Sequence, residues 1–275
     1  MANYTAADIK ELRERTGAGM LDVKKALDEA EGDKSKAQEL LRIKGLKGVT
    51  KREGRTTSNG LVVAKAEAGV GTLVEVLCET DFVAKGEKFG ALADEVLAAA
   101  VAAKATDAES LLAAPAGDKT VKDLLDDANA TIGEKIEVKR VARVEAPNVS
   151  AYLHKTSPDL PAQIGVLLGT EGGDDQVARD VAMHIAAFSP SVLTRDEIDA
   201  ETVENERRIA EETAKEEGKP EAALPKIVEG RVNGFFKENV LLDQPFAKDS
   251  KKSVGKVLEE AGASATQFAR FRVGS

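Results

Sequence analysis

The sequence predicts an α+β fold with an N-terminal three-helix module, two core subdomains with small antiparallel sheets, and a projecting antiparallel helical hairpin. Three observations carry this prediction. Apolar residues recur at helical spacing through residues 3–45. A strand–turn–strand pattern followed by helices fills residues 60–145 and begins again near residue 149. A long charged segment with a thin apolar seam precedes a tight turn at Gly218.

The N-terminal module covers residues 1–45. Thr5 is the predicted N-cap of its first helix, with Asp8 as capping partner, and the third helix is expected to stop at Gly45. The turn between the first two helices either presents Met20 and Leu21 as an apolar contact or places both in the module's core. The pattern leaves Met20 open and favours the core for Leu21.

A basic segment follows, and we assign residues 46–59 as a linker. Six basic residues between positions 42 and 59 face one acid, Glu53, and glycines interrupt the run. The favoured interpretation is a flexible, solvated tether, and the alternative is an arm that binds RNA or an acidic partner. The six basic residues are Arg42, Lys44, Lys47, Lys51, Arg52 and Arg55.

The first core subdomain is assigned to residues 60–145. Alternating residues predict strands over 61–67, 72–78 and 136–145, with a hairpin turn at 69–71 and helices that cover the sheet. Thr80, Asp81, Phe82 and Val83 lie at the corner between the second strand and a long alanine-rich helix. An aromatic side chain held out on a short corner is suited to insertion into a partner.

The second core subdomain is assigned to residues 146–190 and 233–275, with strands at 149–154, 162–169 and 265–273 and a helix over 176–188. Residues 191–232 form the predicted inserted hairpin. Its first helix, residues 196–217, carries ten acids against three basic residues, and we favour plain solvation over docking as the reason.

Composition limits the function classes. The net charge of −9 disfavours general nucleic-acid binding, so we expect no direct nucleic-acid partner, although a local basic patch would still allow one. No apolar run is long enough to span a bilayer, so no membrane partner is expected either. The single cysteine, Cys78, and the absence of a basic-then-apolar leader predict a cytoplasmic protein.

Catalytic and metal-binding patterns are sparse. There is no phosphate-binding glycine loop or dinucleotide motif, and two histidines with one cysteine give little material for a metal site, so no cofactor or metal is expected. Glu79 and Asp81 suit acid–base work only weakly, because acids are common at helix starts. His184 is expected in the core and His154 at the surface. We therefore expect no enzymatic activity.

Several segments resemble one family, bacterial elongation factor Ts. The two specific motifs are LRERTGAGM at residues 12–20, followed by DVKKAL at 22–27, and ETDFVA at 79–84. AMHIAA at 182–187, GKP at 218–220, EGR at 229–231 and QPF at 244–246 also fit, so the resemblance covers nearly the whole chain.

The resemblance implies a guanine-nucleotide exchange factor for the GTPase elongation factor Tu. It implies an N-terminal module of the ubiquitin-associated type that contacts the GTPase domain, and a corner that enters this domain near its Mg²⁺. The corner is then Thr80, Asp81, Phe82 and Val83. Further expected partner contacts are Arg13, Met20, Leu21 and His154.

Two departures from the family pattern stand out. The family often has a second methionine where this chain has Leu21. Some members continue into a further helical module, and because this sequence ends at Ser275 we expect that contact to be missing. The main alternative function is an RNA- or ribosome-binding accessory protein that uses the basic linker, and homodimerisation stays open.

Overall fold

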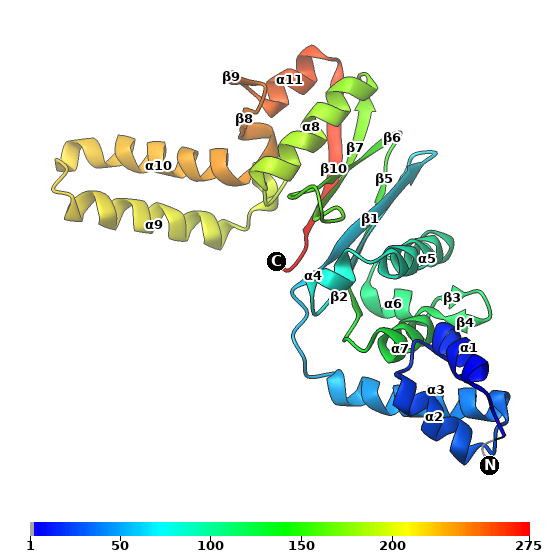
Figure 1. Cartoon of the computed structure of the whole chain (residues 1–275). Helices are drawn as coiled ribbons and strands as arrows, with labels where there is room; N and C mark the ends of the chain where they lie inside the picture. The colour runs from blue at the N-terminus through cyan, green and yellow to red at the C-terminus, as the bar shows by residue number, and fades with distance from the viewer. Residues whose placement is uncertain (1–2) are drawn as a thin grey trace.

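Three helices open the chain in the computed structural model, which describes residues 3–275 (Figure 1). They are α1 (Ala6–Thr16), α2 (Met20–Glu29) and α3 (Lys34–Arg52). The predicted cap of α1 is confirmed, because the Asp8 backbone N–H donates to Thr5 Oγ1 (3.3 Å) and the Thr5 N–H donates to Asp8 Oδ2 (2.7 Å). A small apolar core that includes Leu12, Val23 and Leu27 holds the three helices together.

Leu21 does not join that core, so the packing favoured for it was wrong. Its side chain is 73% exposed, and that of Met20 is 59% exposed. Successive residues of a helix are about 100° apart. With Val23 and Leu27 turned inward, Leu21 lies on the opposite face of α2.

Helix α3 continues through Gly45 to Arg52, so the expected stop at Gly45 was wrong and much of the predicted linker is helical. Packing explains why. A Cβ atom at Gly45 would lie 2.6 Å from Ala130 Cβ, so glycine lets α3 pack closely on α7 (Val121–Ile132). Tertiary contact here outweighs the low helix propensity of glycine.

The first sheet has the antiparallel order β1-β2-β5, with β1 Asn59–Glu67, β2 Val70–Cys78 and β5 Glu137–Glu145. The hairpin turn is Ala68–Gly69, where both residues have positive φ. Val70 and Gly71, which we expected in the turn, pair with β1 and belong to β2. Helices cover one face of the sheet. They are α4 (Asp81–Ala84), α5 (Glu87–Ala103), α6 (Ala108–Ala113) and α7, with the short strands β3 (Pro115–Ala116) and β4 (Lys119–Thr120) between α6 and α7.

The second sheet has the order β10-β7-β6, with β6 Asn148–His154, β7 Ile164–Gly172 and β10 Ala263–Arg272. Its core includes α8 (Asp175–Phe188) and α11 (Val254–Glu260), and β8 (Pro245–Phe246) pairs with β9 (Asp249–Ser253) beside them. The two sheets pack against each other through a cluster that includes Val62, Leu73 and Leu167.

The helical hairpin projects away from the sheets (Figure 1). A short 3-10 turn, Arg195–Glu197, comes first, so α9 begins at Ala200 rather than near 196 and runs to Glu216. Helix α10 runs from Leu224 to Asn239 after a second turn, Glu221–Ala223. No helix within residues 3–275 combines the length and apolar character needed to cross a membrane.

Candidate functional site

The corner after β2 presents an exposed aromatic side chain. Thr80 caps the four-residue helix α4, and its Oγ1 accepts the Val83 N–H (3.4 Å). Ala84 is buried and Val83 packs against the same apolar core, so α4 is anchored on its inner side. Phe82, on the outer side of α4, is 83% exposed. Among residues 3–275 it is the most exposed of the large apolar side chains.

One carboxylate, that of Glu134, holds the backbone of this corner. Its Oε2 accepts the N–H groups of Glu79 (3.1 Å) and Thr80 (3.0 Å), and its Oε1 accepts the Thr80 hydroxyl (2.6 Å). Hydrogen bonds to a charged acceptor are shorter and stronger than neutral ones. Glu134 lies directly after Gly133, the C-cap of α7, so α7 positions the corner.

The hydrogen bonds that fix the corner, which we call its frame, also include the Glu79 side chain. Its carboxylate is therefore not free for acid–base work. Its Oε1 accepts the Lys135 backbone N–H (2.6 Å), and Arg55 donates to both carboxylate oxygens at 3.2 Å. The Lys135 N–H, with Arg55, holds the pKa of Glu79 below its usual range. The Glu79 carbonyl in turn accepts from Asn59 Nδ2 (2.8 Å).

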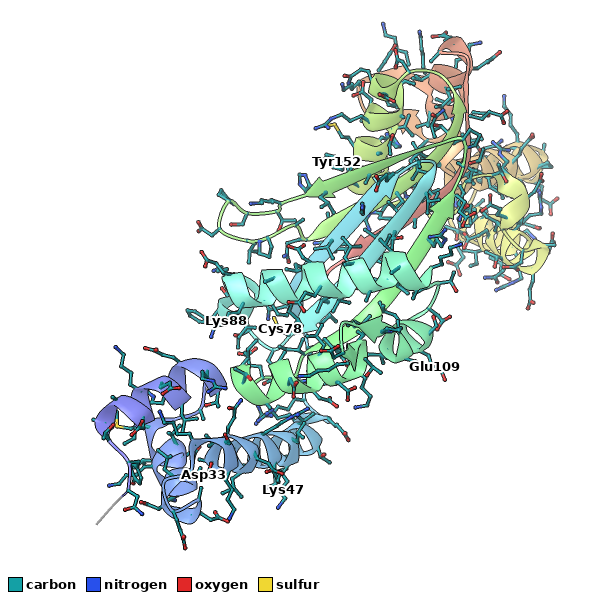
Figure 2. All side chains as sticks on the ribbon, turned by 90° about the vertical axis from the view of Figure 1, so that its right-hand side faces the viewer. Asp33, Lys47, Cys78, Lys88, Glu109 and Tyr152 are labelled. Carbon is teal, nitrogen blue, oxygen red and sulfur yellow. The ribbon has the colours of Figure 1, made fainter. Side chains whose placement is uncertain are left out.

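Cys78 also belongs to the frame, through a hydrogen bond to Thr80. It is buried at the end of β2 and belongs to the same apolar core as α5 (Figure 2). Burial, with a smaller effect of the Glu134 charge, raises the pKa of the Cys78 thiol to about 12. The group therefore stays protonated and donates to the Thr80 carbonyl (3.2 Å).

Asp81 points away from this frame. Its carboxylate forms an ion pair with Lys85, one helical turn later (2.7 Å). The Lys85 hydrogen bond lowers the pKa of Asp81. Glu79 and Asp81 thus each have a separate cation, which is not the arrangement of a catalytic carboxylate pair.

His154 lies at the same end of the sheets as the corner. It ends β6 opposite Ile164, while β1 begins and β2 ends at this edge. As predicted, its side chain is exposed, and its Nδ1 lies 3.1 Å from Tyr152 Oη. The following loop is bound to β1, because Gln163 Nε2 donates to the Gly60 carbonyl (2.9 Å).

The sequence reasoning missed several parts of this edge. Glu134 and Asn59, which hold the corner, are separated from it by 54 and 20 residues, and no local pattern pairs them with it. Leu153, beside His154, is 41% exposed and adds an apolar group. An apolar residue next to a strand end was the one available signal.

Arg13, Met20 and Leu21 lie elsewhere, on the N-terminal module. All three are exposed. Figure 1 shows their helices, α1 and α2, on the opposite side of α7 from α4. A Cβ atom at Gly17, in the turn before Met20, would lie 2.6 Å from Thr131 Cγ2. The module is therefore packed tightly on the end of α7, the helix that also leads to Glu134.

His184 is a core residue, as predicted. Its Nε2 lies 2.8 Å from Gln244 Oε1, and its Nδ1 accepts the Ala247 N–H (3.1 Å). Both ring nitrogens are therefore used, and burial lowers the pKa of His184. Within the described residues, no three His, Cys, Asp or Glu side chains are grouped so that they could hold a metal ion.

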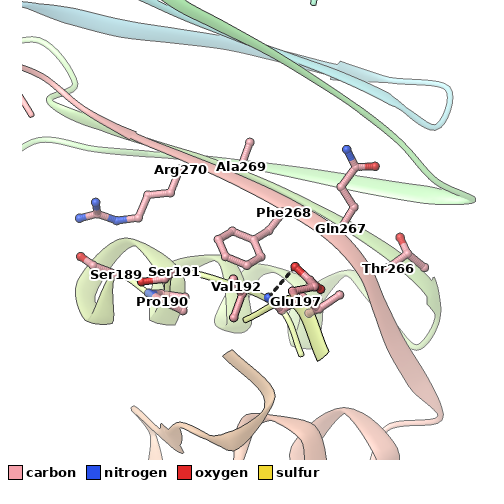
Figure 3. A pocket seen from close by; sticks show the side chains of 11 residues that line it. Ser189, Pro190, Ser191, Val192, Glu197, Thr266, Gln267, Phe268, Ala269 and Arg270 are labelled. Atoms are coloured by element: carbon pink, nitrogen blue, oxygen red, sulfur yellow. Dashed lines mark hydrogen bonds between the residues drawn. The ribbon is translucent and has the colours of Figure 1, made fainter. Parts of the chain in front are cut away.

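A cleft of about 570 Å³ lies beside β10, between residues 189–193 and 266–270 (Figure 3). Its two charged side chains are engaged in structural hydrogen bonds. Glu197 accepts the Leu193 N–H (3.3 Å), and the Arg270 guanidinium donates to the Ala186 carbonyl (3.0 Å). No nucleophile and base meet among its lining residues.

Comparisons with known proteins agree with the resemblance found in the sequence. The family model described as "Elongation factor TS" matches residues 79–275. Relatives named elongation factor Ts from Micrococcus luteus, Kocuria rhizophila and Pseudarthrobacter chlorophenolicus are each 63% identical to this chain, with full coverage of both sequences. The chain therefore belongs to the elongation factor Ts family of translation elongation factors.

Proposed function

We propose that this protein is the guanine-nucleotide exchange factor for the GTPase elongation factor Tu and acts in the cytoplasm. The residues of the corner, Thr80, Asp81, Phe82 and Val83, enter the GTPase domain and disturb the coordination of Mg²⁺ and phosphate. GDP then leaves and GTP can load. The activity needs no covalent chemistry and no cofactor in this chain.

The observation that carries the proposal is the combination of exposure and support at Phe82. The side chain is 83% exposed, yet its four-residue helix is fixed by a buried alanine and by the Glu134 carboxylate. An exposed ring on a flexible loop would yield to a partner. A ring on this frame displaces groups of the partner instead.

Energetics assign Phe82 a share of the exchange activity. Lowering the partner's affinity for GDP about 10⁴-fold requires about 5.5 kcal/mol of preference for the empty GTPase. Burying one phenylalanine supplies roughly 1.5–3 kcal/mol. The remainder has to come from other contacts, and we assign it to Arg13, Met20, Leu21 and His154.

The same proposal divides the chain into functional regions. Residues 1–45 dock on the partner, and residues 46–59, which include the last turns of α3, connect the module to the core. Residues 60–145 carry the corner, and 146–190 with 233–275 form the second subdomain around the inserted hairpin, 191–232. Separate apolar cores in the N-terminal module and on each sheet support this division. The cluster between the sheets holds the two subdomains together.

Release of a fluorescent GDP analogue from elongation factor Tu tests the proposal. We expect Phe82→Ala to slow stimulated release by about 10- to 100-fold, the range that follows from losing the burial of one ring. Ile209→Ala, which trims an apolar side chain of 42% exposure on α9, serves as control and should change little. Unchanged release with Phe82→Ala would refute the proposed role of the corner.

A further inference from the structure

A basic cleft lies between the N-terminal module and α7, away from the corner. Its volume is about 880 Å³. Seven basic and two acidic side chains line it, which leaves five positive charges in excess on a chain whose net charge is −9. The basic residues are Arg15, Arg42, Lys44, Lys47, Lys51, Arg52 and Lys119.

The cleft is a fixed feature of the fold. Its walls come from the end of α1, the length of α3 and the second half of α7. Glycines at positions 17 and 45 bring these walls into close contact with Thr131 and Ala130. The Arg52 guanidinium also fastens them, because its Nη2 donates to the Asn129 carbonyl (2.8 Å).

Internal ion pairs neutralise only part of this charge. Asp22 pairs with Lys44, while Asp127 is shared by Arg42 and Lys119. Within residues 3–275, three lining cations have no carboxylate within 4.0 Å, namely Lys47, Lys51 and Arg52. The Arg52 Nε is in addition buried without a hydrogen-bond partner in the described part of the chain.

The spacing of the cations fits a chain of phosphates. Lys44, Lys47 and Lys51 are three and four residues apart, so they lie on one face of α3 and span about 10 Å along its axis. No aromatic side chain lines the cleft for base stacking. A protein partner would require an apolar contact core, and the lining here is mainly charged and polar.

We infer that this cleft binds the phosphate backbone of RNA without sequence preference. Lys47 and Lys51 contact the phosphates directly, and Arg52 forms the floor of the site. The inference does not depend on the proposed exchange activity, because the corner takes no part in it. It also revises the expectation, drawn from net charge, that this chain does not bind nucleic acid.

Fluorescence anisotropy with a labelled 12-nucleotide oligouridylate, measured from 50 to 200 mM KCl, tests the inference. With three phosphate contacts, the logarithm of the affinity should fall with the logarithm of salt with a slope of about −2. Lys47→Glu with Lys51→Glu should weaken binding at least about tenfold and make the slope shallower by about 0.7 per lysine.

Lys226→Glu with Lys237→Glu is the matched control, because it changes the net charge equally on exposed positions of α10. Circular dichroism melting confirms that each variant is folded. Equal losses in both double variants, or no RNA binding by the wild-type chain at 50 mM KCl, would overturn the inference.

Competition separates RNA from other occupants of the cleft. Unlabelled oligouridylate should displace the probe far better than inorganic tripolyphosphate at equal phosphate concentration. Equal displacement would restrict the cleft to small phosphate ligands and overturn the RNA assignment. A dimer in solution that Lys47→Glu with Lys51→Glu abolishes, without RNA binding, would assign the cleft to a second copy of this chain.

Discussion

Two sites of this molecule, here called its tips, expose large apolar side chains: Phe82 on α4, and Met20 with Leu21 on α2. The backbone beneath the side chains is supported differently at the two tips. Phe82 stands on α4, whose backbone is fixed by Glu134 and whose inner side is buried. Met20 and Leu21 begin α2 after Gly19, which gives no side-chain cap. Exposure is similar at both tips, at 83% for Phe82 and 73% for Leu21.

The difference in support separates two kinds of contact. A side chain on a fixed backbone can displace groups of a partner, because moving it back would break the partly buried hydrogen bonds to Glu134. Side chains at an uncapped helix start can adjust to a partner surface, and methionine does so readily. We therefore assign insertion to the corner and docking to the N-terminal module.

The largest expected effect is on the reactivity of the Cys78 thiol, which reports whether the corner opens. With its pKa raised to about 12, Cys78 has roughly 10³-fold less thiolate at pH 8 than a free cysteine. Native protein should therefore react with a thiol reagent at least about 10³-fold more slowly than protein unfolded in urea. Rapid labelling of the native chain would show that the corner opens and would remove its contrast with α2.

Removing the carboxylate of Glu134 tests the frame itself. Glu134→Ala leaves the N–H groups of Glu79 and Thr80 without this acceptor, and because both are only partly buried the cost is about 1 kcal/mol each. We expect the free energy of unfolding to fall by roughly 2 kcal/mol and stimulated GDP release to slow about tenfold.

Glu134→Gln is the matched control, because one amide oxygen remains as acceptor. It should fall between the wild type and Glu134→Ala in both measurements. Full exchange activity in Glu134→Ala would show that Phe82 needs no rigid support.

Truncating the apolar side chains of α2 should weaken the affinity for the partner and leave the maximal exchange rate unchanged. In the double variant Met20→Ala with Leu21→Ala, lost burial against the partner raises the concentration for half-maximal exchange about tenfold. The maximal rate should stay within about twofold, and stability within about 0.5 kcal/mol since both sites are exposed. A lower maximal rate at unchanged half-saturation would contradict the assignment of docking to α2.

The smallest effect is the titration of Asp81. Lys85 lowers the pKa of Asp81, so their pairing stabilises the fold above the ordinary aspartate pKa and is lost as pH falls through the lowered value. Lys85→Met should shift the carboxyl midpoint in NMR upward toward its usual value. Lys88→Met, a nearby exposed lysine on α5, should leave it unchanged.

The sequence was most informative where order is local. Apolar periodicity located the strands and most helices, and the cap of Thr5 by Asp8 was read correctly because its partners are three residues apart. The exposed ring of Phe82 was also predicted, because a short polar corner leaves it nothing to pack against.

Long-range packing limited the prediction elsewhere. The glycines of α3 indicated a break, but Gly45 is what lets the helix pack on Ala130. The frame of the corner depends on Glu134 and Asn59, whose distance along the chain hides their proximity. The basic residues of α3 were recognised in the sequence as a possible RNA-binding arm, but the cleft was not predicted, because α1, α3 and α7 meet only in the folded chain.

Helix α7 has a consequence for how tightly the proposed partner is held. The N-terminal module packs on Ala130 and Thr131, and four and three residues later Glu134 fixes the corner. The two tips therefore stand at one set spacing, and docking of the first raises the effective concentration of the second at its target. We propose that a GTPase whose two binding surfaces lie at a different spacing loses this avidity, so that α7 discriminates between partners by geometry.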